Sequence, residues 1–231
     1  MEGLLYNAVL KSSRANEKLL AILIDPDKFN VSKTQLFLKN IPTETTHLFV
    51  GGSSVENGTT EKTVRSLKQN TQLPVLLFPG DYSQITDLAD GLLFLNLLSG
   101  RNPEYLVGQQ VKAVPKLRNS SLEIIPTGYI LIDGGTVSAV SRVTRTEPIS
   151  QGDTDLIVST ALAGQFMGAK LLYLEAGSGA KFSVKERIIS EVKKVIKIPL
   201  IVGGGIKTEQ QKQAAYQAGA DMVAMGTVYE K

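Results

Sequence analysis

The feature that most constrains the fold is a series of eight short apolar runs along the chain. They are rich in Val, Ile, Leu and Phe, and most of them end in Gly, Pro, Asp or Asn. The runs span residues 19–27, 47–52, 74–80, 91–98, 123–132, 170–177, 199–205 and 222–227. Each is nearly continuously apolar instead of alternating, which is typical of parallel strands that are buried on both faces.

Stretches with helical features lie between these runs. The predicted helices span residues 59–69, 103–117, 155–167, 184–196 and 208–218. Thr59 is a candidate N-cap, Pro103 lies near the first helical position, and Gly219 follows the last helix as a stop. Eight strands alternating with helices predict one α/β domain over residues 1–231, with the strands closed into a (β/α)8 TIM barrel. An open parallel sheet is the alternative.

Two segments depart from this alternation. Residues 133–152 are rich in Gly, Ser and Thr, and they predict a long loop after the fifth strand. Loops at that end of a barrel strand lie on the face where barrels keep their active sites. The eighth predicted strand is followed by only a few residues up to Lys231. We therefore expect no eighth helix in this sequence.

Composition narrows the classes of function. The chain has no Cys and one histidine, His47, so disulfides and thiolate metal sites are excluded and Cys-His or Ser-His hydrolase centres are unsupported. His47 precedes the second strand instead of ending it, so we interpret it as structural. Neither a Walker A sequence nor GxGxxG after a strand is present. The net charge of +3 is too small to indicate a nucleic-acid-binding protein.

No segment predicts a membrane span. The strongest apolar run, from Gly91 to Leu98, is far shorter than the ~20 residues that a spanning helix needs. The N-terminal segment mixes acidic and basic side chains and lacks a cleavage site of small residues, so no signal peptide is expected. We therefore expect a cytoplasmic protein.

Glycines gather at the ends of the seventh and eighth predicted strands. They are Gly204 and Gly205 in VGGGI, and Gly226, which Thr227 follows, in MGT. The loops after strands seven and eight are the usual phosphate site of a TIM barrel, because glycines let backbone N–H groups approach an anion. We predict that these four residues bind a phosphate; tight turns without a ligand are the alternative. Many unrelated barrels share this feature, so it indicates a ligand class and not a reaction.

Two carboxylates lie at predicted strand ends. Glu175 in YLEAGSGA would end the sixth strand, where it could accept hydrogen bonds from hydroxyls or act as a general base. Asp25 in IDPDK would end the first strand, and it suits Mg²⁺ held by one or two carboxylates and by substrate phosphates. Asp27 is the alternative metal ligand. The structural alternatives are that Glu175 forms a salt bridge or a helix cap and that Asp25 belongs to a plain Asp-Pro turn.

Further polar residues follow the second and fourth predicted strands. Ser53 in GGSS could donate to a phosphate or complete the shell of the metal. The end of the fourth strand supplies Asn96, Ser99 and Arg101. Arg101 suits a diphosphate because a guanidinium group binds pairs of oxygens, and a solvated surface arginine is the alternative.

In this order along the chain, these segments resemble the geranylgeranylglyceryl phosphate synthase family, which includes the bacterial heptaprenylglyceryl phosphate synthases. The resemblance covers residues 20–228, and its details are closer to the archaeal and Bacteroidetes branch. The segments that carry it are IDPDK, FVGGS, ADGLLFLNLLSGRNPEYL, PTGYILIDGG, YLEAGSGA, VGGGI and MGT. YLEAGSGA together with the paired glycine motifs is the most specific part.

The resemblance implies a Mg²⁺-dependent prenyltransferase on a TIM barrel that is modified around its third helix. Such an enzyme joins a polyprenyl diphosphate to the C3 hydroxyl of sn-glycerol 1-phosphate and releases diphosphate. The short stretch 81–89 is consistent with a shortened third helix, which would open a lateral groove for the prenyl tail. The family also suggests a homo-oligomer, a dimer or hexamer, and the lipid product suggests transient contact with a membrane.

Roles at individual positions follow from the same resemblance. Asp25 and Ser53 would form the Mg²⁺ site, and Glu175 would contact the hydroxyls of glycerol phosphate, with Tyr173 beside it in a catalytic role. Arg101 would assist at the diphosphate if it points inward, and Asn96 and Ser99 are further candidate substrate contacts at the end of the fourth strand. The remaining glycerol phosphate contacts would come from Tyr173, Leu174, Ala176, Gly177, Ser178 and Gly179, with the phosphate held by Gly204, Gly205, Gly226 and Thr227.

Other functions remain open at this point. A heptaprenylglyceryl phosphate synthase would differ in prenyl chain length, which the residues do not determine. A barrel enzyme for a phosphorylated sugar or amine would use the same glycine clusters and no prenyl diphosphate. A phospho-ligand-binding protein without activity would need neither Asp25 nor Glu175.

Overall fold

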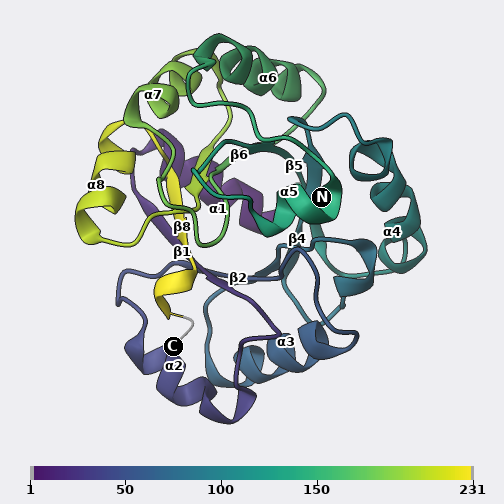
Figure 1. Cartoon of the computed structure of the whole chain (residues 1–231). Helices are drawn as coiled ribbons and strands as arrows, with labels where there is room; N and C mark the ends of the chain where they lie inside the picture. The colour runs from purple at the N-terminus through teal and green to yellow at the C-terminus, as the bar shows by residue number, and fades with distance from the viewer. Residues whose placement is uncertain (1–2, 230–231) are drawn as a thin grey trace.

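The computed structural model describes residues 3–229, and its strands form a closed barrel of eight parallel strands in sequential order. Figure 1 shows this ring with helices around it. The predicted TIM barrel is therefore confirmed. The strands are β1 (Leu19–Ile24), β2 (His47–Val50), β3 (Val75–Leu77), β4 (Gly91–Leu97), β5 (Glu123–Leu131), β6 (Leu171–Glu175), β7 (Leu200–Gly203) and β8 (Met222–Met225).

The helices lie mostly outside this ring (Figure 1). None of the helices among residues 3–229 is both long and apolar enough to cross a membrane. The α-helices are α1 (Leu4–Arg14), α2 (Thr34–Asn40), α3 (Thr59–Asn70), α4 (Gln109–Leu117), α5 (Ala139–Thr144), α6 (Thr154–Phe166), α7 (Glu186–Val195) and α8 (Glu209–Gln217). Of these, α3, α4, α6, α7 and α8 lie close to predicted ranges, whereas α2 and α5 were not predicted. Short 3₁₀ and π segments are η1 (Val31–Lys33), η2 (Tyr82–Gln84), η3 (Glu104–Gly108) and η4 (Thr227–Tyr229).

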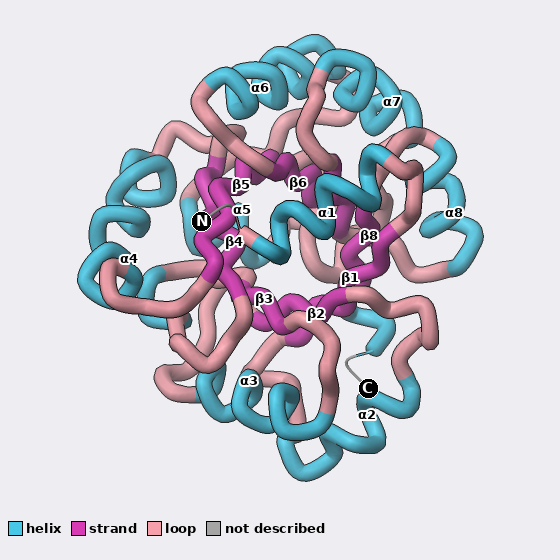
Figure 2. The backbone as a smooth tube through the Cα atoms, turned by 180° about the vertical axis from the view of Figure 1, so that it is seen from behind, coloured by secondary structure: helices cyan, strands magenta, loops and turns pink. Residues whose placement is uncertain are grey.

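Helix α1, which the sequence analysis did not predict, lies across the N-terminal end of the barrel, as the view from behind shows (Figure 2). Its Val9 packs into the cluster of side chains that fills the barrel interior. The Glu123 carboxylate, at the start of β5, accepts hydrogen bonds of 2.7 Å from the N–H groups of Leu5 and Tyr6. These N–H groups belong to the first turn of a helix and have no partner within it. The carboxylate therefore fixes α1 as the floor of the barrel.

The buried apolar side chains form two layers, because successive strand residues point to opposite faces. One face of each strand packs against the surrounding helices, and the other fills the barrel interior. In β6, for example, Leu172 and Leu174 point outward, whereas Leu171 and Tyr173 point inward. Strands buried on both faces explain why the sequence shows continuous apolar runs.

The barrel wall is weakest between β3 and β4. These strands pair through only two residue pairs, Leu76 with Gly91 and Leu77 with Leu92, whereas β4 and β5 pair along seven. The connection from β3 to β4 contains the single 3₁₀ turn η2 in place of a regular helix. This agrees with the shortened third helix that the family resemblance implies.

Two local expectations need correction. Thr59 is the first residue inside α3, and Gly58 occupies the N-cap position with a φ of 83°, so Thr59 is not a cap. Residues 133–152 are not one long loop, because they contain α5 and a strand-like bridge between Ile132 and Ile149. Six residues make fewer than two helical turns, so the segment is too short to show the apolar periodicity of a helix. After β8 the described chain adds only η4, and the end at Lys231 lies outside the described residues.

His47 occupies a structural position, as expected. It lies at the start of β2, near the end of the barrel opposite the active-site face, and its Nδ1 is 2.8 Å from the hydroxyl of Thr46. Burial lowers its pKa to about 4, so the imidazole is neutral at physiological pH. It does not line the cavity described below.

Candidate active site

A cavity of about 130 Å³ opens at the end of the barrel where the strands terminate. It collects side chains and backbone from the ends of β1, β2, β3, β5, β6, β7 and β8, as expected for a TIM barrel site. The residues predicted for the site that line it are Asp25, Ser53, Tyr173, Glu175, Ser178, Gly204, Gly205 and Gly226. The structure thus brings together in one place residues that are far apart in the sequence.

Glu175 is the acidic group at the centre of this cavity. Its side chain is 5% exposed, and its Oε1 accepts a 2.6 Å hydrogen bond from the N–H of Gly177. Burial raises the pKa of Glu175 to about 7, while the Gly177 N–H and the nearby Tyr173 hydroxyl partly oppose this rise. A carboxylate with a pKa near 7 can take up a proton at neutral pH, which is what a general base requires.

Two buried tyrosines lie beside Glu175. The rings of Tyr129 and Tyr173 stack with their centroids 5.5 Å apart. Burial and the charge of Glu175 raise the pKa of both phenols, so both stay protonated. Among the described residues the buried Tyr173 hydroxyl has no hydrogen-bond partner of regular geometry, so it can donate to a ligand oxygen.

The glycines after β7 leave room that no other residue would leave. Gly204 has a φ of +77°, and a Cβ there would lie 2.2 Å from Oε1 of Glu175. Gly205 has a φ of +70°. Side chains at these positions would be strained and would fill the space beside the carboxylate. The turn therefore presents bare backbone to the cavity, as an anion site needs.

Asp25 and Ser53, from the loops after the neighbouring strands β1 and β2, both line the cavity. The Asp25 carboxylate forms an ion pair of 3.0 Å with Lys28 and accepts a hydrogen bond from the N–H of Asp27. The Asp27 carboxylate instead accepts the N–H of Glu56 at 3.0 Å and does not line the cavity. One carboxylate and one hydroxyl suit a Mg²⁺ ion that keeps water and phosphate oxygens as its other ligands. Among the described residues no cluster of three acidic or histidine groups forms a closed metal site.

Lys28 and Lys207 were not predicted, and both line the cavity. Lys28 lies three residues after Asp25, in the turn that follows β1, and pairs with it. Lys207 follows the glycines after β7 and donates to the carbonyl oxygen of Ala180. Both lysines add positive charge to the lining of the cavity. A lysine just beyond IDPD and another just beyond VGGGI are the sequence features that could have indicated them. Tyr129, two residues before the end of β5, was also missed.

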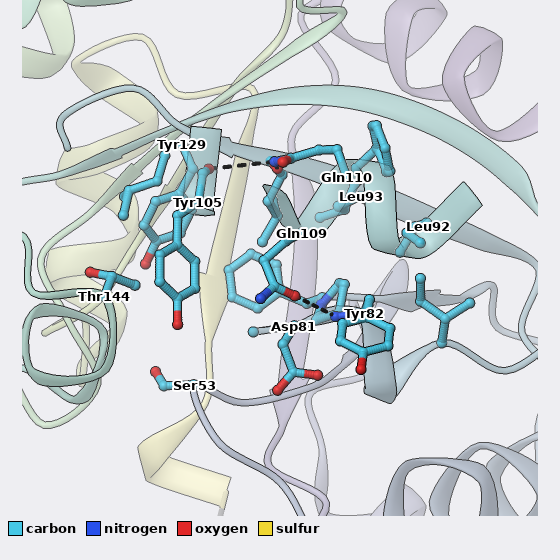
Figure 3. Close-up of a pocket in the computed structure, with 18 of the residues that line it drawn as sticks. Ser53, Asp81, Tyr82, Leu92, Leu93, Tyr105, Gln109, Gln110, Tyr129 and Thr144 are labelled. Atoms are coloured by element: carbon cyan, nitrogen blue, oxygen red, sulfur yellow. Dashed lines mark hydrogen bonds between the residues drawn. The ribbon is translucent and has the colours of Figure 1, made fainter. Parts of the chain in front are cut away.

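An apolar groove, whose lining residues Figure 3 shows, lies along β4 and the segment that follows β3. Its sides come from β4, η2, α4 and α5, and its lining is mostly apolar. The Gln110 amide donates to the carbonyl oxygen of Leu95 at 2.6 Å, and the Gln109 amide oxygen accepts the N–H of Tyr82. These bonds serve backbone groups that a regular β3–β4 pairing and a third helix would otherwise satisfy.

The cavity and the groove share a wall. Gly52, Ser53, Phe78, Tyr129 and Val140 line both of them. The ring centroids of Phe78 and Tyr129 are 6.0 Å apart, so two aromatic faces flank the junction. A ligand with a polar head in the cavity and a hydrocarbon tail in the groove would have its connecting atoms at this junction.

Some predicted residues do not line the cavity. Arg101 is exposed, and its guanidinium donates to the carbonyl oxygens of Leu98 and Gly100 in its own turn. Asn96 donates to the carbonyl oxygen of Leu106, and the Ser99 hydroxyl accepts the N–H of Leu131. In the loop around Glu175, Leu174 packs outward, and Ala176, Gly177 and Gly179 shape the backbone without lining the space. Thr227 begins η4, but its side chain lies outside what the structure describes.

The sequence model of the PcrB family matches residues 13–231 of this chain. The geranylgeranylglyceryl phosphate synthase of Zunongwangia profunda is 55% identical over 98% of this chain and 97% of its own. That of Thermococcus kodakarensis is 40% identical over 93% of this chain and 85% of its own.

The solved structures that this chain resembles include members of the same group of synthases. The crystal structure of (S)-3-O-geranylgeranylglyceryl phosphate synthase from Thermoplasma acidophilum in complex with its substrate sn-glycerol-1-phosphate superposes with a TM-score of 0.90 at 35% identity, covering 100% of this chain and 93% of the other. The wild-type protein of Thermoplasma volcanium gives a TM-score of 0.87 at 37% identity, covering 96% and 90%. An N-acetylmannosamine-6-phosphate 2-epimerase from Clostridium perfringens, 12% identical with a TM-score of 0.58, shares the fold alone.

Proposed function

Because this chain belongs to the PcrB family, we propose that it is a prenyltransferase that joins a polyprenyl group, geranylgeranyl in the first instance, to the C3 hydroxyl of sn-glycerol 1-phosphate. The observation that carries this proposal is the shared wall between a polar cavity and an apolar groove. Glycerol phosphate would occupy the cavity, and the prenyl chain would occupy the groove. Both relatives and the superposed structure are named for this reaction, and the latter was solved with sn-glycerol-1-phosphate.

In the reaction, the bond between C1 of the prenyl chain and the diphosphate oxygen breaks, and the electron pair leaves with the diphosphate. The oxygen of the glycerol C3 hydroxyl forms a new bond to C1, which gives the ether. The proton of that hydroxyl passes to the Glu175 carboxylate, whose raised pKa of about 7 suits this transfer. Tyr129 and Phe78 line both spaces, so with C1 at the junction their aromatic rings would lie near the positive charge that develops there.

The remaining residues bind and orient the substrates. Backbone N–H groups of Gly204, Gly205 and Gly226, together with Lys207, would hold the phosphate of glycerol phosphate. Asp25 and Ser53 would hold Mg²⁺ beside the diphosphate, with Lys28 adding a positive charge. When bound, Mg²⁺ neutralises charge on the leaving diphosphate. Arg101 would have to leave the carbonyl oxygens of its own turn to contribute, so we assign it no step.

The test is product formation with defined substrates. The protein is incubated with sn-glycerol 1-phosphate, Mg²⁺ and prenyl diphosphates of graded length, and the prenyl glyceryl phosphate is identified by mass spectrometry. We expect product and free diphosphate in equal amounts, with the greatest kcat/KM for the geranylgeranyl substrate. A maximum at the heptaprenyl substrate would make it a heptaprenylglyceryl phosphate synthase. Absence of product with every prenyl diphosphate would overturn the proposal.

A further inference from the structure

The surface around α5 combines exposed apolar and cationic side chains. Val137, just before α5, is 71% exposed, and Val143 in its last turn is 40% exposed. Arg142 and Arg145 flank Val143, and both are exposed. We refer to these four residues together with Arg101 as the α5 patch.

Arg101 belongs to the α5 patch because its turn packs against the end of α5. The Asn102 amide donates to the carbonyl oxygen of Thr144 at 2.9 Å. A Cβ on Gly100 would lie 2.8 Å from the hydroxyl oxygen of Thr146. The three arginines are thus carried by two segments in direct contact.

The charge of the α5 patch is not neutralised by its neighbours. None of the three arginines forms an ion pair within the part of the chain that the structure describes. Of the acidic side chains close in sequence, Glu104 pairs with Lys112, and the exposed Asp133 and Glu147 are fewer than the three arginines. The patch therefore carries net positive charge beside exposed valines.

The inner face of α5 closes the site already described. Val140 lines both the cavity and the groove, Ala139 lines the cavity, and Thr144 lines the groove. Both views place α5 within the outline of the barrel ring (Figures 1 and 2). A prenyl chain in the groove would lie directly under the helix whose outer side carries the α5 patch.

We propose that the α5 patch docks this protein on the surface of an anionic lipid bilayer. Exposed apolar side chains beside cationic ones are the combination by which a short amphipathic segment binds at a charged membrane interface. The valines would enter the headgroup region, and the arginines would pair with anionic headgroups. The docked orientation would turn the groove toward the bilayer, from which a prenyl substrate enters and to which a lipid product returns.

This inference rests on the proposed function only for its purpose, and its test does not need the reaction. Vesicles of phosphatidylcholine with increasing fractions of phosphatidylglycerol are mixed with the intact protein, and bound protein is separated by flotation. We expect binding to rise with the anionic fraction and to fall as salt is added. Equal binding to vesicles with and without phosphatidylglycerol would overturn the proposal.

Two variants test the two parts of the α5 patch. The charge variant combines Arg142→Gln, which removes the charge and keeps a polar side chain, with Arg145→Asn, which tolerates the φ of 52° at that position. Loss of two arginines near a charged surface should lower binding about 30-fold. Val137→Asp is the apolar variant, and it should lower binding at high salt as well.

Leu156→Asp is the matched control for Val137→Asp. Leu156 is 44% exposed in the first turn of α6, where Asp153 and Asp155 already lie, so an added Asp does not disturb the helix. Its vesicle binding should equal that of the unchanged protein. If Leu156→Asp lowers binding as much as Val137→Asp does, the α5 patch is not the docking surface.

Parallel measurements separate this proposal from its rivals. If the α5 patch instead contacts a second copy of the chain, the charge variant shifts the molar mass measured by light scattering and leaves vesicle binding unchanged. Activity toward a short, water-soluble prenyl diphosphate should be the same in the charge variant, whereas activity toward a long prenyl diphosphate in anionic vesicles should fall. An active protein that does not float with vesicles contradicts only the docking, and an inactive protein that floats contradicts only the proposed function.

Discussion

Glu175 combines burial, a single backbone hydrogen bond and two neighbouring phenols. We predict that Glu175→Gln lowers kcat by roughly 10²–10⁴-fold, because the amide keeps the shape but cannot take up the hydroxyl proton. Glycerol phosphate should still bind within a few fold, since the amide oxygen can accept a hydrogen bond. Steady-state kinetics and calorimetry on the same preparation measure both. A kcat within threefold of the unchanged protein would remove Glu175 from the reaction.

The titration of Glu175 also predicts two pH dependences. In the proposed reaction the Glu175 carboxylate takes up the hydroxyl proton, so kcat/KM should rise with pH and level off above about 7. Stability should change in the opposite direction. Because the folded-state pKa is raised from 4.5 to about 7, the native protein holds this proton more tightly than the unfolded chain does.

The stabilising contribution of the protonated group is complete below pH 4.5 and is lost as the pH rises through 7. The loss amounts to about 3 kcal/mol by pH 8, as an order of magnitude. The unfolding free energy of Glu175→Gln relative to the unchanged protein should therefore increase between pH 5 and pH 8. Urea unfolding at several pH values tests this, and a difference that does not vary with pH would contradict the buried, shifted carboxyl.

Asp25 and Asp27 differ by two positions and have different surroundings, which makes them a matched pair. Asp25 lines the cavity, whereas the Asp27 carboxylate holds the N–H of Glu56. We predict that Asp25→Asn raises the Mg²⁺ concentration for half-maximal activity at least about tenfold, because Mg²⁺ sites depend on carboxylate charge. Asp27→Asn should leave the Mg²⁺ titration unchanged. The opposite ranking of the two variants would assign the metal to Asp27.

At the scale of elements, the short turn η2 stands in place of a regular third helix, and the groove lies between η2, α4 and β4. We predict that Ala113→Leu, on the inner side of α4, raises the KM for long prenyl diphosphates more than for short ones. The larger side chain narrows the groove, at a cost of about 1–3 kcal/mol in stability from overpacking. Val111→Leu is the control, since Val111 is 64% exposed on the outer side of the same helix. An equal rise in KM for prenyl diphosphates of every length would mean that the prenyl chain does not bind in this groove.

The elements show where sequence reasoning succeeds and where it stops. Strands β1 to β8 were predictable because continuous apolar runs reflect burial on both faces, and Glu175 and the glycines were predictable because barrel strands end at one face. Helix α5 was not, because six residues give too short a period. Lys207 was missed because a lysine after a strand is ordinarily solvated, and only the closed barrel turns it over the cavity. Thr59 failed as a cap because Gly58 already supplies the turn.

At the scale of the whole molecule, the two ends of the barrel have separate tasks. The mouth carries the cavity, whereas the floor is closed by α1. We predict that Glu123→Ala lowers the Tm by roughly 4–8 °C, because two N–H groups of α1 lose their acceptor at a cost of about 2 kcal/mol. The kcat should stay within twofold, since the change lies at the stability face of the barrel. Thermal unfolding and kinetics of the same variant test this, with the exposed Glu17→Ala as control.

The narrow pairing of β3 and β4 has a further consequence. A barrel wall is ordinarily covered by its own helices, but here part of that covering layer is left out between η2 and α4. A hydrocarbon chain lying in the groove would supply the missing layer, so that the substrate serves for a time as a piece of the hydrophobic core. After product release, the side chains that line the groove would lack this packing partner until the next prenyl chain binds. Substrate binding would complete the folding of the barrel as well as begin the reaction.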